Sequence, residues 1–154
     1  MTTHSAHTNT SKTTIQKAAA AVGTVFLLVG ILGFVPGITT DYDTMKFGGH
    51  ESEAELLGIF QVSILHNIVH LLFGAAGLAL ARSVKGAQAF LIGGGLVYLV
   101  LFIYGLAIDH HSSANFVPLN DADNWLHLVL GIGMIALGLL LAPKRDGRAA
   151  TTTA

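Results

Sequence analysis

The sequence contains no cysteine and few charged residues. The lack of cysteine excludes disulfides, thiolate metal sites and thiol catalysis, and it leaves histidine as the main candidate ligand for a transition metal. Charged residues make up only 11% of the 154 residues and hydrophobic residues make up 52%. The mean hydropathy is +0.63. Such an apolar composition is typical of a membrane protein rather than a soluble domain.

Signatures of nucleic-acid binding and of common enzymes are also absent. No block of basic residues indicates a nucleic-acid partner. Nothing resembles a nucleophile elbow, a phosphate-binding loop or a zinc-protease helix. A catalytic role therefore lacks its usual parts, and the sequence names no reaction.

Four apolar stretches predict an all-α fold, a four-helix transmembrane bundle made of two tandem helical hairpins. Each stretch approaches or exceeds the roughly 20 residues that a helix needs to cross a bilayer. The first is longer than the apolar core of a signal peptide, so we expect it to be retained. Ser52 and Glu55 form a capping-box pattern that predicts a helix start just before Leu56. The stretches cover residues 18–35, 56–81, 87–108 and 125–142. We expect one membrane domain at 17–143, preceded by a disordered polar tail at 1–16 and followed by a C-terminal tail at 144–154.

Basic residues segregate to one side of the predicted membrane. If both tails and the loop at 82–86 share a side, that side holds seven of the eight basic residues and one acid, Asp146. The positive-inside rule then places both termini in the cytoplasm. The opposite side holds Lys46 and eight acidic residues, which give it a negative field. The seven basic residues are Lys12, Lys17, Arg82, Lys85, Lys144, Arg145 and Arg148, and the eight acids are Asp41, Asp43, Glu51, Glu53, Glu55, Asp109, Asp121 and Asp123.

The two halves of the chain resemble each other. The segment at 65–74 and the segment at 122–131 both carry an asparagine, a histidine three residues later and a glycine four residues after that. In the preceding stretches, Gly23, Phe26 and Gly33 align with Gly95, Tyr98 and Gly105. We expect two parallel two-helix hairpins related by a pseudo-two-fold axis along the membrane normal.

Ionisable side chains fall inside or at the edge of the predicted spans, where each costs roughly 3 kcal/mol near the bilayer centre. His66 and His70 are four residues apart, and so are Asp123 and His127, so each pair projects from one helix face. The first hypothesis is that these residues, with Asn67 and Asn124, form interhelical hydrogen bonds in a structural or interacting protein. Asp123 would then cap the fourth helix.

The alternative hypothesis is an intramembrane redox protein that binds haem or a metal ion. His70 and His127 on facing helices would be the axial haem ligands. His66, His70, Asp123 and His127 would form an N3O set for zinc or another first-row metal. A proton or ion relay through the same groups is a third hypothesis. Residue counting pairs His127 in depth with His66, whereas the repeat pairs it with His70, and helix tilt leaves both open.

The sequence resembles a family of small bacterial four-span membrane proteins, domain of unknown function four-three-eight-three. The resemblance rests on the residues at 33–37, 56–60, 65–74 and 120–127 and covers nearly everything between Lys17 and Ala142. It implies an integral, multi-pass protein of the bacterial cell membrane and no activity. The lipid bilayer is the expected partner, with a second copy or other membrane proteins left open, and the cofactor is unknown.

Overall fold

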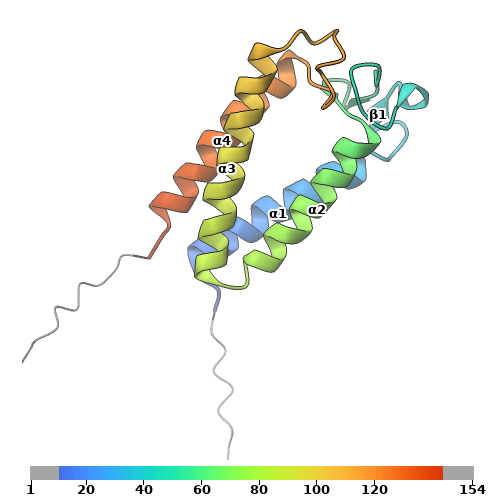
Figure 1. Ribbon diagram of the computed structural model, residues 1–154. Helices are drawn as coiled ribbons and strands as arrows, with labels where there is room; N and C mark the ends of the chain where they lie inside the picture. Colours follow the sequence, from blue (N-terminus) through green and yellow to red (C-terminus); the bar gives the residue numbers. More distant parts are fainter. Residues whose placement is uncertain (1–10, 144–154) are drawn as a thin grey trace, which may run out of the picture.

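The computed structural model describes residues 11–143, which form four helices and a small three-stranded sheet. The helices are α1 (Thr14–Leu32), α2 (Ile64–Leu80), α3 (Val84–Ala107) and α4 (Asp121–Leu140). Their main contacts join α1 to α2 and α3 to α4, so the fold is a pair of helical hairpins. Figure 1 shows these hairpins meeting at the turn between α2 and α3 and diverging towards the opposite end. The prediction of an all-α four-helix bundle is confirmed.

The helices have the length and composition of membrane spans. Three of them, α1, α3 and α4, are long and apolar enough to cross a bilayer, and α2 is a shorter apolar helix of 17 residues. Large hydrophobic side chains such as Leu72, Val100 and Val129 are exposed on the outside of the bundle. An apolar outer surface of this kind is suited to lipid rather than water, and we treat the chain as a membrane protein.

The second helix begins later than the sequence analysis predicts. Residues on either side of Leu56 form strands β1 (Thr39–Thr40), β2 (Glu55–Leu56) and β3 (Phe60–Gln61), paired antiparallel in that order. The tight turn between β2 and β3 places Leu57 and Gly58 at positive φ, which ends any helical path there. A short 3-10 turn, η1 (Tyr42–Thr44), lies in the same loop.

The predicted capping box at Ser52 and Glu55 is wrong. The buried Ser52 hydroxyl donates to the Val62 carbonyl at 2.6 Å and accepts from the Lys46 N–H at 3.1 Å, so it joins loop segments instead of capping a helix. Ser63 is the N-cap of α2, and its hydroxyl accepts from the His66 N–H at 3.1 Å. The cap fixes the start of α2, because it satisfies a backbone donor that the helix leaves without a partner.

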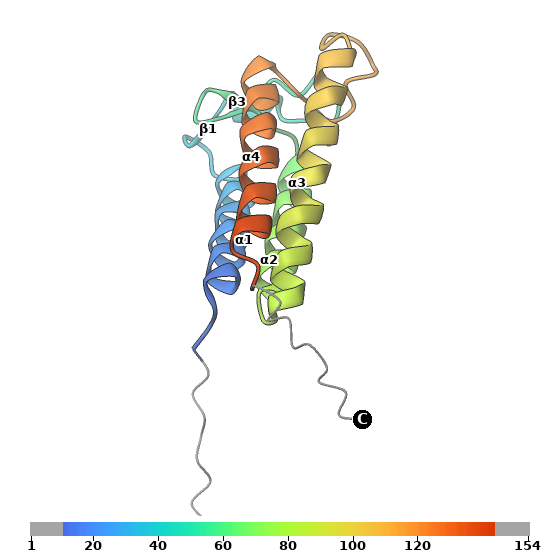
Figure 2. The same cartoon turned by 90° about the vertical axis from the view of Figure 1, so that its left-hand side faces the viewer.

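Both ends of the described chain lie at the same end of the bundle as the turn between α2 and α3 (Figures 1 and 2). Helix α1 begins at Thr14, inside the segment that we expected to be a polar tail, and the Thr13 N–H donates to Gln16 Oε1 at 3.0 Å. The rest of that predicted tail, at 1–10, and the predicted tail from 144 lie outside the described residues. The loops at 33–63 and 108–120 lie at the opposite end of the bundle.

The two hairpins make the same internal contacts. Gln16 of α1 donates to the Ala81 carbonyl at 3.1 Å, and Gln88 of α3 donates to the Gly138 carbonyl at 3.3 Å. The backbones of Gly23 and Gly74 touch in the first hairpin, as do those of Gly95 and Gly131 in the second. Equivalent residues of α1 and α3 are always the same number of positions apart along the chain. Equivalent residues at the ends and crossings of α2 and α4 are also a constant number of positions apart, which differs from the first. Small residues at these crossings let the helices approach closely.

Candidate functional site

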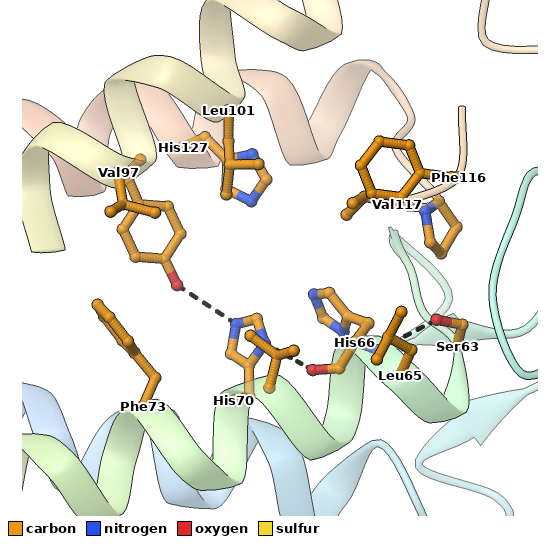
Figure 3. Close-up of a pocket in the computed structure, with 13 residues that line it drawn as sticks. Ser63, Leu65, His66, His70, Phe73, Val97, Leu101, Phe116, Val117 and His127 are labelled. Carbon is orange, nitrogen blue, oxygen red and sulfur yellow. Dashed lines mark hydrogen bonds between the residues drawn. The ribbon is translucent and has the colours of Figure 1, made fainter. Parts of the chain in front are cut away.

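A cavity of about 300 Å³ lies where the two hairpins diverge. Helix α2 forms one side, α3 with His127 of α4 forms another, and the loop before α4 covers one end. Figure 3 shows the rings of His66, His70 and His127 directed into this space. The lining residues are Ser63, Leu65, His66, Val69, His70, Phe73, Val97, Tyr98, Leu101, Phe116, Val117, Pro118 and His127.

His66 and His70 stand side by side on α2, with ring centroids 4.1 Å apart. His70 Nδ1 lies 3.0 Å from the His66 carbonyl oxygen, which can only accept, so Nδ1 carries the proton. His66 Nδ1 lies 3.4 Å from Asn67 Oδ1, which likewise accepts. In the neutral imidazole the other nitrogen is an acceptor. Both histidines therefore present an acceptor Nε2 to their surroundings.

Tyr98 of α3 connects the histidines of the two hairpins. Its hydroxyl donates to His70 Nε2 at 3.4 Å, and its ring lies 5.1 Å from the ring of His127. Phe26 of α1 stacks on Tyr98 at 5.5 Å and meets the His70 ring edge-on at 5.8 Å. Phe26 thus makes a ring contact with His70 in the first hairpin, and its aligned residue Tyr98 makes a ring contact with His127 in the second. His70 and His127 are each the seventh residue of their helix, so they occupy equivalent places in the two hairpins.

His127 is buried, with 4% of its surface exposed. Among the described residues, its Nδ1 has no hydrogen-bond partner. Burying an imidazole nitrogen without a partner costs about 1–3 kcal/mol. Asn124 Oδ1 is a second buried atom without a partner among the described residues, and such atoms are few in native structures.

Asp123, the carboxylate of the predicted metal set, is not part of the cavity lining. Its Oδ2 accepts from the Asn120 N–H and from the Gln61 N–H, both at 3.1 Å. Asn120 is the N-cap of α4, and Asp123 completes its capping box. Asn120 Nδ2 also donates to the Ile59 carbonyl at 2.8 Å. Asp123 therefore caps α4 and ties it to the small sheet at Gln61.

The structure thus brings three of the four predicted ligands to one cavity and places the fourth elsewhere. Within residues 11–143, no three His, Asp or Glu side chains gather closely enough to hold a metal ion. The two residues predicted as axial haem ligands, His70 and His127, both contact Tyr98. Its hydroxyl contacts His70 and its ring contacts His127.

The two asparagines lie inside the hairpins. Asn67 packs against Gly33, and Asn124 packs against Gly105, so closely that a Cβ on either glycine would overlap the amide oxygen. Both asparagines are buried. Asn124 Nδ2 lies 3.3 Å from His110 Nε2, which itself lies 2.9 Å from the Gly105 carbonyl oxygen. These contacts lie near the end of each hairpin that carries the long loops at 33–63 and 108–120.

The sequence analysis missed two residues of this region, Tyr98 and His110. The repeat aligns Tyr98 with Phe26 and so isolates the Tyr98 hydroxyl as a difference between the halves. No local sequence pattern marks His110. Its contacts with Gly105 and Asn124 arise only when the loop folds back on α3 and α4.

A comparison with protein families finds one match, to a domain of unknown function (DUF4383), over residues 16–140. The chain belongs to this family. The match spans all four helices except the first two residues of α1. No curated protein and no solved structure matches the chain.

Proposed function

We propose that this member of the DUF4383 family crosses a bacterial cell membrane four times, with both termini in the cytoplasm, and has a structural or interacting role rather than an enzymatic one. In this proposal residues 17–143 are the membrane domain, and the segments 1–16 and 144–154 are polar tails. The proposal includes α2, whose 17 residues are at the lower end of the range that can span a bilayer.

The observation that carries the structural role is the pair of asparagine–glycine contacts. Asn67 on Gly33 and Asn124 on Gly105 place a polar side chain against bare backbone inside each hairpin. In a bilayer, small residues and interhelical polar contacts replace the hydrophobic effect as the force between helices. Buried polar side chains used in this way hold helices in register and need no substrate.

The same contacts support an internal repeat. In the first hairpin, Gln16 and Gly23 of α1 and the C-cap residue Gly33 contact residues of α2 or its C-cap. Their counterparts in α3, Gln88, Gly95 and Gly105, contact residues at corresponding positions of α4. We infer that the two hairpins arose by duplication and are related by a pseudo-two-fold axis along the membrane normal. His70 and His127 would be one equivalent pair across that axis.

The absence of cysteine makes the topology straightforward to test. Single-cysteine variants Ser113→Cys, in the loop before α4, and Ser83→Cys, in the turn between α2 and α3, would be treated with a membrane-impermeant maleimide in intact cells. Both serines are exposed. We expect labelling of Ser113→Cys at once and labelling of Ser83→Cys only after permeabilisation, with Thr152→Cys behaving like Ser83→Cys. Labelling of all three sites from outside would contradict four spans.

A second candidate function is binding of a metal ion or haem, favoured by the three imidazoles around one cavity and the unpartnered His127 Nδ1. His70 and His127 would be the haem ligands, and rotation of the Tyr98 hydroxyl away from His70 would free its Nε2. A metal ion would have to draw His66, His70 and His127 closer together than they lie in the structure. Elemental analysis and a visible spectrum of protein purified in detergent test this candidate. A stoichiometric metal or a Soret band that His127→Phe removes would replace the structural role, and its absence would leave that role standing.

A further inference from the structure

The cavity opens sideways between α2 and α3. Val69 of α2 and Val97 of α3 both line it and are half-exposed on the outside of the bundle. These positions lie well inside their helices, at the level where the proposed bilayer surrounds the protein. Anything that enters between them comes from lipid, so the ligand is expected to be lipid-soluble.

The walls of the cavity select an apolar molecule with a flat part. Three aromatic rings line it, Phe73, Tyr98 and Phe116, and most of the other lining residues are aliphatic. Phe116, Val117 and Pro118 belong to the loop before α4. A planar ring can stack on such walls at little cost in ordering, whereas a charged molecule would lose its hydration without gaining a counter-ion.

The polar atoms of the cavity select a hydroxyl group. Because the Nδ1 atoms of His66 and His70 donate within α2, their Nε2 atoms are acceptors, and Tyr98 already donates to that of His70. His66 Nε2 is left as an acceptor. Neutral His127 has one nitrogen that donates and one that accepts, and this residue also lines the cavity. A hydroxyl can donate to one imidazole and accept from another, whereas an ether or a ketone can only accept.

We propose that this cavity binds the hydroxyl-bearing ring of a lipid-soluble phenol or hydroquinone, which enters from the bilayer between Val69 and Val97. The hydroxyl donates to His66 Nε2 and accepts from His127, and the ring lies against the aromatic walls. The proposal rests on the membrane location proposed above and requires neither a metal nor a redox step.

A matched pair of ligands tests the hydrogen-bonding part of the proposal. The protein in lipid nanodiscs is titrated calorimetrically with 4-octylphenol and with its methyl ether, 4-octylanisole, and empty nanodiscs supply the partitioning blank. We expect saturable one-to-one binding of the phenol and about tenfold weaker binding of the ether, because the ether lacks the donor and leaves a buried acceptor unsatisfied. In His66→Leu we expect the two ligands to bind equally.

A matched pair of variants tests the location. Val97→Trp fills the entrance, whereas Val100→Trp lies on the same helix but outside the lining and is more exposed. Val97→Trp is expected to abolish saturable binding and Val100→Trp to retain it. Far-UV circular dichroism of both variants checks that they are folded, and Val69→Trp serves as a second blocking variant if Val97→Trp is not.

Three results would overturn the proposal: no saturable binding to the wild type, equal affinity for phenol and ether, or binding that survives both blocking variants. Equal affinity for the phenol and the ether would mean that the cavity binds an alkyl chain or a detergent without a specific hydrogen bond to its polar group. The cysteine labelling separates these failures from failure of the membrane proposal. If the labelling pattern fits four spans but no phenol binds, only the proposal of a phenol ligand is contradicted.

Discussion

Replacing Gly105 by alanine should loosen the second hairpin, and replacing Gly93 should not. Both glycines are in α3, Gly93 near its middle and Gly105 in its last turn. A Cβ on Gly105 would overlap Asn124 Oδ1 and lie 2.6 Å from its Cγ, whereas a Cβ on Gly93 would meet no atom within 4 Å. Gly105→Ala therefore forces the Asn124 side chain or the whole of α4 to move, and Gly93→Ala is a matched control on the same helix.

The size of the effect follows from overpacking and from helix propensity. Overpacking a buried contact costs about 1–3 kcal/mol. The gain in helix propensity on replacing glycine by alanine, up to about 1 kcal/mol, applies fully to Gly93 and less to Gly105 in the last turn of α3, so it adds to the difference. Gly105→Ala should thus be less stable than Gly93→Ala by about 1–4 kcal/mol.

The free energy of unfolding would be measured for both variants in mixed detergent micelles of increasing denaturing strength, with far-UV circular dichroism as the signal. The double variant Gly105→Ala/Asn124→Ala should recover part of the loss, because the smaller side chain makes room for the new methyl group. Stabilities of Gly105→Ala and Gly93→Ala that agree within about 0.5 kcal/mol, the usual scatter between independent sites, would refute the reasoning.

Two further predictions use the same unfolding assay. Gly33→Ala should destabilise the first hairpin in the same direction, because its Cβ would overlap Asn67 Oδ1, whereas Gly133→Ala, with no atom within 4 Å, should be neutral or slightly stabilising; equal values would contradict the role given to Asn67. Asp123→Ala should cost about 2–3 kcal/mol because it removes the acceptor of two backbone N–H groups. Asp121→Ala, at a side chain that is 95% exposed, should cost much less, and the reverse order would show that Asp123 does not anchor α4.

Hydropathy was sufficient to predict the helices but not where α2 begins. Residues 56–60 are as apolar as a span, so composition assigned them to the helix. Their conformation is set by the turn at Leu57 and Gly58 and by pairing with Thr39 and Thr40, and neither is visible in a hydropathy average. The Ser52 pattern failed for a related reason: its hydroxyl had a tertiary partner, Val62, that a local capping rule does not consider.

The candidate site could be predicted only in part, because its geometry depends on pairing between the hairpins. The sequence comparison aligned His70 with His127 and Asn67 with Asn124; each histidine is the seventh residue of its helix, and each asparagine packs against a glycine. The repeat could not show that Asp123, which aligns with His66, would face the small sheet at Gln61 instead of the cavity. The contact of Tyr98 with both histidines likewise depends on the packing of α3 against the first hairpin, which no local spacing encodes.

The bonds from α4 to the small sheet have a mechanical consequence. The hairpins are joined covalently by the short turn at one end, and the Gln61–Asp123 and Ile59–Asn120 hydrogen bonds fasten them at the other. Because the two hairpins are held together at both ends, they cannot separate as rigid bodies. They can move apart only if the helices bend between the two attachment points. The width of the gap between Val69 and Val97 is then governed by residues outside the cavity lining. Asp123→Ala removes one of these two hydrogen bonds, so it should change the rate at which the proposed ligand leaves more than the affinity of the cavity for it.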